Sequence, residues 1–510
     1  MERRMIDLPN VDDLRRIGSE LGFELDDMEL AEVRDSLSSF DVTYAHLDKL
    51  EEPSLPVTYP RRDVRRPHAA ENALNAWYWR CSIHGMPTGL LAGKTIAVKD
   101  SICVAGVPMM NGSAVVEGFV PDIDASVVSR VLAAGGEIVG KAVCENLSFA
   151  GNSFTADTGP VLSPMIAERS AGGSSSGCGA LVSSGACDMA LGCDTGGSIR
   201  TPSSMCGIVG LKATFGLVPR TGIFPMEMSL DHVGPMARNV EDVAAMLTAI
   251  AGYDGLDPQQ GQVQIGNYLE SLDLGAHGLR VGVLEDGFGL PESELEVDAT
   301  VRSAIATFGQ LGADVQSVSI PIHREATHIH TVITAEGVAA LLVDGETTGT
   351  NWRGFYNSSL QVHWARRRRA QANDLPLHVK RDLLFGQFMH QRHRGRYYAK
   401  AQNAARLVQA AYDAALEDVD VLAMPTIPMK PPLLPGGPVD LEETLRLCHG
   451  MTANTRPFNV SGHPAISIPC GVVDDLPVGL MLVARRWDEA TLLRTAMAFE
   501  RANRVAGRPS

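Results

Sequence analysis

The sequence lacks an excess of positive charge. Its 510 residues include 44 lysines and arginines against 60 aspartates and glutamates, which gives a formal net charge of −16 at pH 7. Proteins that bind nucleic acids normally show a basic surplus, so we expect no nucleic-acid partner. The one basic run, Arg366 to Arg369, has the composition of a solvated helix face.

The cysteine and histidine patterns of disulfide frameworks and metal sites are also missing. The nine cysteines are odd in number and form no C-x-x-C pair, and the 14 histidines show no H-E-x-x-H spacing. Such a pattern predicts reduced thiols in a cytoplasmic protein, with no bound metal.

Long apolar runs are absent as well. No stretch reaches the roughly 18 continuous apolar residues that a membrane-spanning helix needs. The first 13 residues contain no apolar segment of the kind found in signal peptides. The sequence therefore predicts neither a membrane association nor a secretion signal.

The chain is predicted to begin with a small helical extension. Apolar residues recur at helical spacing between residues 10 and 50, for example Leu14, Ile17 and Leu21, which predicts two or three short helices. The segment 51–68 is rich in proline and charge and is typical of a linker. We therefore divide the chain into an extension with its linker, 1–70, and a second domain, 71–510.

After residue 75, short apolar strands alternate with helices. Residues 95–98 are typical of a strand, 125–134 of a helix and 137–139 of another strand. Near the C-terminus, residues 464–469 and 478–484 are typical of a strand pair joined by a turn around Asp474 and Asp475. This alternation predicts an α/β fold with a central mixed β-sheet flanked by helices.

Residues 172–212 carry the chemistry-bearing pattern. They read GGSSSGCGALVSSGACDMALGCDTGGSIRTPSSMCGIVGLK. Dense glycine with interspersed hydrophobic residues indicates backbone packed closely around a site. Gly173 to Gly177 also matches G-x-S-x-G, which would make Ser175 a nucleophile. However, the residues before it do not form the apolar strand that such an elbow requires.

The whole segment resembles the amidase-signature family. It has a Gly-Gly-Ser-Ser start, a small-residue helix, Asp-x-Gly-Gly-Ser-Ile-Arg and a Pro-Ser-Ser-x-Cys-Gly-x-x-Gly-x-Lys tail. The resemblance covers roughly residues 70–500. Residues 109–113 and 214–225 look especially like bacterial amidases associated with nitrile metabolism, which hydrolyse short aliphatic and aromatic amides to acid and ammonia.

The resemblance implies a Ser–Ser–Lys triad. Carried over by motif, Ser198 is the nucleophile, and Lys99 is the base that acts through Ser174. The resemblance also implies a cis peptide bond between Gly173 and Ser174. A serine hydroxyl needs a base to become an effective nucleophile, and lysine can serve only when neutral, a form that burial favours.

Further roles follow from the same motif. The backbone N–H groups of Thr195, Gly196, Gly197 and Ser198 are predicted to bind the oxyanion that forms when the amide carbonyl is attacked. Three residues are expected to support the triad and its turn: Ser175, Asp194 and Arg200.

Substrate contacts are predicted by analogy with the nitrile-metabolism subgroup. Phe149, Leu230 and His330 are expected to line the acyl pocket, and an apolar wall favours a hydrophobic acyl group. The resemblance implies a small-molecule amide as partner, no cofactor, and a homodimer formed through the N-terminal helices.

Alternatives remain open. The same triad could cleave a carbamate, anilide, hydrazide or ester, because each reaction passes through a tetrahedral oxyanion. The chain could also be the glutamine-amidase component of a tRNA amidotransferase, although the N-terminal extension and the absence of Gln after LPVG speak against it. A catalytically inactive scaffold is disfavoured by the intact Lys99, Ser174 and Ser198.

Overall fold

The computed structural model describes residues 6–505 and consists of two compact units. The first runs to Pro56 and the second starts at Val57. This boundary lies earlier than the predicted residue 70 because Arg61 and the strand after it are held by the larger unit. The Arg61 guanidinium forms an ion pair with Asp124, and Arg62–Arg65 pairs with a strand of the main sheet.

The small unit contains three helices, as the sequence predicts: α1 (Val11–Leu21), α2 (Asp27–Ser36) and α3 (Ser38–Leu47). Asn10 and Asp26 begin the first two with reciprocal capping boxes, which satisfy the amide groups that a helix start leaves unpaired. In the described part of this unit, Leu30 is the one buried large hydrophobic side chain. The three helices therefore enclose almost no core of their own.

The large unit is built on one mixed sheet of twelve strands, in the order β1-β2-β4-β3-β5-β7-β6-β11-β12-β10-β8-β9. β3 is parallel to both β4 and β5, whereas β5 is antiparallel to β7. The predicted α/β fold with a central mixed sheet is confirmed. The strands are β1 (Arg62–Arg65), β2 (Trp77–His84), β3 (Thr95–Lys99), β4 (Glu137–Ala142), β5 (Met189–Asp194), β6 (Val209–Lys212), β7 (His232–Ala237), β8 (Arg280–Leu284), β9 (Asp314–Val318), β10 (Val421–Pro425), β11 (Ala465–Val473) and β12 (Leu476–Ala484).

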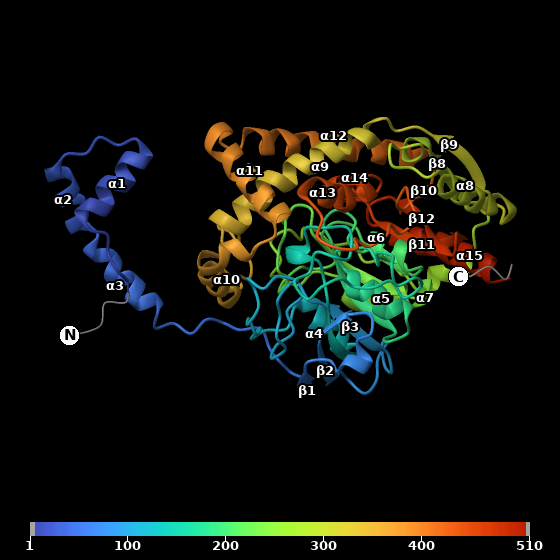
Figure 1. Ribbon diagram of the computed structural model, residues 1–510, viewed down its shortest axis with the longest axis horizontal. Helices are drawn as coiled ribbons and strands as arrows, with labels where there is room; N and C mark the ends of the chain where they lie inside the picture. The colour runs from blue at the N-terminus through green and yellow to red at the C-terminus, as the bar shows by residue number, and fades with distance from the viewer. Residues whose placement is uncertain (1–5, 506–510) are drawn as a thin grey trace. The chain divides into compact units, whose positions relative to one another are not determined.

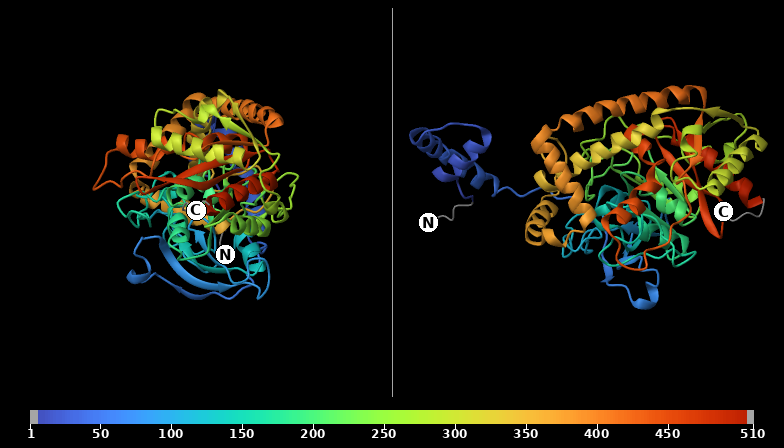
Figure 2. Two further views of the ribbon diagram at one scale, coloured as in Figure 1. Left: turned by 90° about the vertical axis from the view of Figure 1, so that its right-hand side faces the viewer. Right: turned by 45° about the horizontal axis from the view of Figure 1, so that its top comes forward.

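Helices flank this sheet (Figure 1). α9 contacts α11, α12 and α14, and the long α12 runs beside α9 in the second view of Figure 2. The helices of the large unit are α4 (Ser126–Ala133), α5 (Ser176–Ser183), α6 (Arg200–Met205), α7 (Val240–Ile250), α8 (Leu295–Gln310), α9 (Ile322–Ala339), α10 (Ser358–Gln371), α11 (Leu377–His393), α12 (Arg396–Asp418), α13 (Leu441–His449), α14 (Arg456–Ser461) and α15 (Glu489–Val505).

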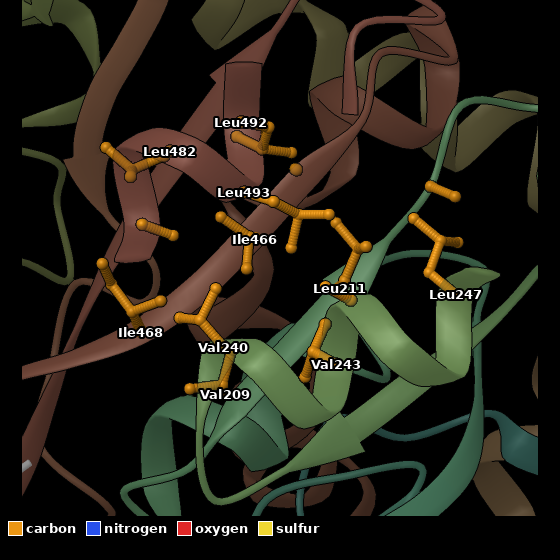
Figure 3. Packing of buried hydrophobic residues seen from close by; sticks show 14 of the residues in the cluster. Val209, Leu211, Val240, Val243, Leu247, Ile466, Ile468, Leu482, Leu492 and Leu493 are labelled. Atoms are coloured by element: carbon orange, nitrogen blue, oxygen red, sulfur yellow. The ribbon is translucent and has the colours of Figure 1, made fainter. Parts of the chain in front are cut away.

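The main core lies between the sheet and helices α7 and α15. There β6 packs against α7, and β11 and β12 pack against α15. Figure 3 labels Val209, Leu211, Ile466, Ile468 and Leu482 from the strands with Val240, Val243, Leu247, Leu492 and Leu493 from the helices. This packing holds the C-terminal hairpin β11–β12 beside β6, so the two halves of the chain share one core.

The β11–β12 hairpin turns at Asp474 and Asp475, as predicted. Both residues adopt positive φ, 52° and 61°, a conformation that aspartate tolerates better than most residues. The strands then pair with Ala465 opposite Val483 and Ile466 opposite Leu482.

One helical stretch, Ile322–Asp344, is long and apolar enough to cross a membrane by length and composition alone. It comprises α9 and the short π-helix Ala340–Asp344 that follows. Half of its most apolar window is buried inside the structure, where α9 packs against neighbouring helices. A core helix of a folded domain passes the same test, so this finding is weak evidence for a membrane span.

We expect Leu482→Ala to lower the free energy of unfolding by about 2–5 kcal/mol, because it leaves a cavity in the centre of the sheet. Leu482 is fully buried, between Ile466 of β11 and Ala423 of β10. Urea unfolding measures the change. Val472→Ala, at a position 42% exposed on the same hairpin, is the control. Equal losses in the two variants would contradict this account of the core.

Candidate active site

Lys99 and Ser174 meet in the interior of the large unit. Lys99 is the last residue of β3, and Ser174 lies just before α5, after a cis peptide bond from Gly173. Both side chains are fully buried. The Lys99 Nζ donates a hydrogen bond of 2.7 Å to the Ser174 Oγ. Two residues 75 positions apart in sequence are thus in direct contact.

Ser198 lies in the turn between β5 and α6. The neighbour of Ser174 joins the two segments, since the Ser175 N–H donates to the Ser198 carbonyl oxygen at 3.2 Å. Ser198 is only partly buried and lines a pocket. The structure therefore brings the three predicted triad residues into one region, with the lysine inside and Ser198 facing the pocket.

The turn that carries Ser198 is held by a buried ion pair. Arg200 binds both carboxylate oxygens of Asp194, with Nε to Oδ2 at 3.0 Å and Nη2 to Oδ1 at 2.9 Å. Asp194 also accepts the N–H groups of Gly197 and Ile199. Burial alone would raise the pKa of the Asp194 carboxyl, but the Arg200 guanidinium and the Asn459 amide hold it well below its ordinary value.

This arrangement changes the predicted set of oxyanion donors. The Gly197 N–H is directed at Asp194 Oδ1, at 2.8 Å, and is therefore engaged within the turn. The N–H groups of Thr195, Gly196 and Ser198 are the other predicted donors. Within residues 6–505, none of these three N–H groups has a hydrogen-bond partner in the protein. Gly197 helps to shape the turn instead.

Three side chains donate hydrogen bonds to backbone carbonyl groups of this turn. The Asn459 Nδ2 donates to the Asp194 carbonyl at 3.1 Å. The His330 Nε2 donates to the Thr195 carbonyl at 2.9 Å, and the Thr455 Oγ1 donates to the Gly196 carbonyl at 2.7 Å. Because a trans peptide unit is planar, a fixed carbonyl directs the following N–H to the opposite side. The three contacts therefore orient the N–H groups of residues 195, 196 and 197.

His330 makes this contact as a neutral ring with its proton on Nε2. A carbonyl oxygen can only accept, so the Nε2 carries the proton. Burial, followed by the positive charge of Arg456, lowers the pKa of His330 to about 3. The Thr334 Oγ1 lies 3.3 Å from the other ring nitrogen. The contact between His330 and the turn therefore keeps one protonation state across the neutral pH range.

Ser175 is bound on both sides. Its Oγ donates to the Cys193 carbonyl at 3.1 Å and accepts the Cys193 N–H at 3.3 Å. The side chain is fully buried and fastens the start of α5 to β5. This geometry fits a supporting residue and disfavours Ser175 as the nucleophile.

Two pockets border the triad. One, with an empty volume of about 470 Å³, contains Ser198, Gly196, Phe149 and His330 in its wall. The other, of about 790 Å³, reaches Lys99 and is lined by aromatic side chains such as Trp352. Two of the residues predicted to line the acyl site, Phe149 and His330, lie in the wall of the Ser198 pocket.

Leu230 is not among the residues that line these two pockets. Its side chain is 1% exposed and packs with Ile333 of α9 and Ala401 of α12. The prediction that it walls the acyl site is therefore corrected. Its apolar character serves helix packing, and its carbonyl oxygen accepts from His232.

Sequence reasoning missed Asn459, Thr455 and Glu145. The first two lie in the segment before Pro464, which resembles the family but has no catalytic motif of its own. Burial raises the pKa of Glu145 to about 7, although Thr155 and Ser176 donate hydrogen bonds to it. Its N–H donates to the carbonyl oxygen of Ser174 at 3.2 Å, so it lies next to the triad.

The part of the chain that the structure describes contains no group of three or more histidine, cysteine, aspartate or glutamate side chains placed to hold a metal ion. The residues around Ser198 bring together hydroxyl, amine and backbone N–H groups. Together with the α/β fold, these groups define a serine hydrolase-like site with a lysine in place of the usual histidine.

Comparison with known proteins agrees with this class. The amidase family model matches residues 67–493. The enantioselective amidase of Rhodococcus rhodochrous is 44% identical over 97% of this chain and 96% of its own length.

Two solved structures share the fold. Peptide amidase from Stenotrophomonas maltophilia has a TM-score of 0.67 and 29% identity over 82% of this chain and 84% of its own. A glutamyl-tRNA(Gln) amidotransferase chain from Thermotoga maritima has a TM-score of 0.68 and 28% identity, over 85% and 88%. The chain belongs to the amidase family and is a hydrolase of amide bonds.

We expect Thr455→Val to lower kcat about 10-fold with little change in KM. The substitution keeps the shape of the side chain but removes the donor that fixes the Gly196–Gly197 peptide unit. That unit lies between the free N–H groups of Gly196 and Ser198, and oxyanion contacts act mainly in the transition state. Steady-state kinetics measure the effect. Thr331→Val, on the exposed face of α9 where the hydroxyl bonds only to the Thr327 carbonyl, is the control. A rise in KM at constant kcat would contradict a role in orienting the turn.

Proposed function

We propose that this protein hydrolyses carboxamides to carboxylic acid and ammonia through an acyl-enzyme on Ser198. The observation that carries the proposal is the buried contact between Lys99 Nζ and Ser174 Oγ, 2.7 Å long. It is joined to the Ser198 turn through the adjacent residue Ser175. The hydrogen-bond partner of this buried lysine is the Ser174 hydroxyl, not a carboxylate. We propose that this hydroxyl passes the proton between Ser198 and Lys99.

In the proposed mechanism the Ser198 Oγ attacks the amide carbonyl carbon while its proton passes through Ser174 to Lys99. The free N–H groups of Thr195, Gly196 and Ser198 stabilise the resulting oxyanion. Collapse of the tetrahedral intermediate breaks the C–N bond, and the proton held by Lys99 returns to the nitrogen, which leaves as ammonia. Water then attacks the ester by the same route and releases the acid.

The substrates are proposed to be small primary amides. Relatives named as an enantioselective amidase and a peptide amidase support amide hydrolysis. The amidotransferase alternative receives less support, because the match to the Rhodococcus protein includes the N-terminal region and covers nearly the whole of both chains. Carbamate, anilide, hydrazide or ester cleavage remains the second candidate, since the triad acts on any of these carbonyl groups.

We also propose a cytoplasmic location. All nine cysteines lie in the described part of the chain, and each is a buried free thiol. Reduced thiols of this kind suit a reducing compartment.

The protein is further proposed to act as a homodimer through its N-terminal helices. These helices expose large apolar side chains, among them Leu21, Phe23, Phe40 and Leu47, each more than half exposed. With Leu30 as the one buried large hydrophobic side chain among its described residues, this unit buries little apolar surface of its own. A second copy of the same helices would cover these side chains with an equally apolar face.

To test the chemistry, ammonia release is measured from a series of amides between acetamide and benzamide. We expect wild-type protein to release ammonia, and Ser198→Ala to lose at least about 10³-fold in kcat because the nucleophile is removed. Ser184→Ala, on an exposed residue after α5, is the matched control.

Unchanged activity in Ser198→Ala would contradict the assigned nucleophile. If wild type releases no ammonia but still reacts with a fluorophosphonate, the nucleophile is active and the scissile bond is one of the alternatives.

To test the dimer, molar mass is measured by light scattering during size-exclusion chromatography. We expect two chains for the wild type and one chain for the double variant Phe40→Glu, Leu47→Glu, because charge on an apolar contact is costly to bury. Ser39→Glu, which adds charge at an exposed polar position of the same helix, should stay dimeric. A monomeric wild type would refute the proposal.

A further inference from the structure

An arginine without a carboxylate partner faces the pocket that contains Ser198. Arg456, the first residue of α14, lines this pocket and is partly buried. Its Nη2 donates to the His449 Nδ1 at 2.8 Å. Within residues 6–505, no carboxylate lies within ion-pair distance of its guanidinium, whereas Arg200 in the neighbouring turn has both oxygens of Asp194.

The side chain of Arg456 lies against the turn that binds the reacting carbonyl. A Cβ built on Gly196 would lie 3.5 Å from the Arg456 Cγ and 3.1 Å from the His330 Nε2. The stem of the Arg456 side chain therefore passes beside Gly196, and its guanidinium lies a few bonds further along that side chain. A group bound to it would belong to the acyl part of the substrate and would be joined to the scissile carbonyl by a short chain.

Arg456 stays positively charged, and the Asp382 carboxylate in the same pocket attracts it from beyond ion-pair distance. Burial lowers the pKa of Arg456 to about 10, so the guanidinium stays protonated at neutral pH. His330 and His449 are neutral there, because burial and the Arg456 charge lower the pKa of each to about 3. Asp382 also lines the pocket, but it forms an ion pair of 2.7 Å with Arg381.

We propose that Arg456 binds a carboxylate on the acyl group of the substrate, so that the preferred substrates are monoamides of dicarboxylic acids. This inference rests on the amidase function proposed above and specifies its substrate class. A guanidinium presents two parallel N–H donors that match a carboxylate. A wholly apolar acyl group would instead exclude water from the guanidinium without replacing the lost hydrogen bonds, which is costly.

Asp382 places a negative charge in the same pocket. Its carboxylate shares the pocket with the bound acyl group, so it repels an anionic substrate while Arg456 attracts it. Removal of the two charges must therefore change selectivity in opposite directions. A residue with a merely structural role would not produce such a pair of effects.

The experiment compares kcat/KM for malonamate, succinamate and glutaramate with kcat/KM for neutral aliphatic amides of the same length. We expect wild type to prefer at least one anionic amide by about 10-fold or more, the effect of one charge-assisted hydrogen-bond pair. Arg456→Gln should lower this ratio about 10- to 100-fold, and Asp382→Asn should raise it. Arg446→Gln, which removes an exposed arginine paired with Glu443, should leave it unchanged.

Binding provides a second readout in case Arg456→Gln folds poorly. The matching dicarboxylates should inhibit the wild type competitively, and inhibition should weaken in Arg456→Lys, which keeps the charge but loses the paired donors. Hydrolysis of neutral amides with no preference for anionic ones, or an anionic preference that survives Arg456→Gln, would overturn the inference alone. Absence of ammonia release from every amide would instead refute the amidase proposal itself.

Discussion

The buried ion pair between Asp194 and Arg200 is the interaction on which the active site depends. It links the end of β5 to the start of α6 across the turn that carries Ser198, and its carboxylate also binds two N–H groups inside that turn. A buried charge that loses its partner is strongly destabilising. The pair therefore fixes one backbone path, and the surrounding side chains only need to select which N–H groups stay free.

That selection is made by elements from the second half of the chain. Asn459 and Thr455 belong to or adjoin α14, and His330 belongs to α9. The common core of β6, β11, β12, α7 and α15 holds the C-terminal hairpin beside the signature segment, so these distant residues can approach the turn. Hydrophobic packing brings the helices that carry these residues close to the turn. Hydrogen bonds between 2.7 and 3.1 Å then fix the positions of their side chains relative to its carbonyl groups.

Much of this arrangement could be predicted from the sequence, and the exceptions share a physical cause. The mixed sheet, the N-terminal helices and the Asp474–Asp475 turn follow from local patterns, and the contact of Lys99 with Ser174 follows from the motif. The hydrogen bonds of His330, Thr455 and Asn459 join residues 135 to 265 positions apart, which no local pattern reveals. The prediction for Leu230 is wrong because an apolar residue near a site is equally suited to a pocket wall or to helix packing. The domain boundary differs because pairing of β1 is also a long-range event.

The position of His330 has a consequence for altering the enzyme. One imidazole forms part of the wall of the Ser198 pocket and also donates to a carbonyl of the turn that carries Ser198. Selectivity and turnover are therefore linked through a single side chain. Enlarging the cavity at this position would also loosen the backbone beneath it, whereas changes at Phe149, on another segment of the wall, leave that support intact. A change in the size of this pocket is thus coupled to the Ser198 turn at His330 but not at Phe149.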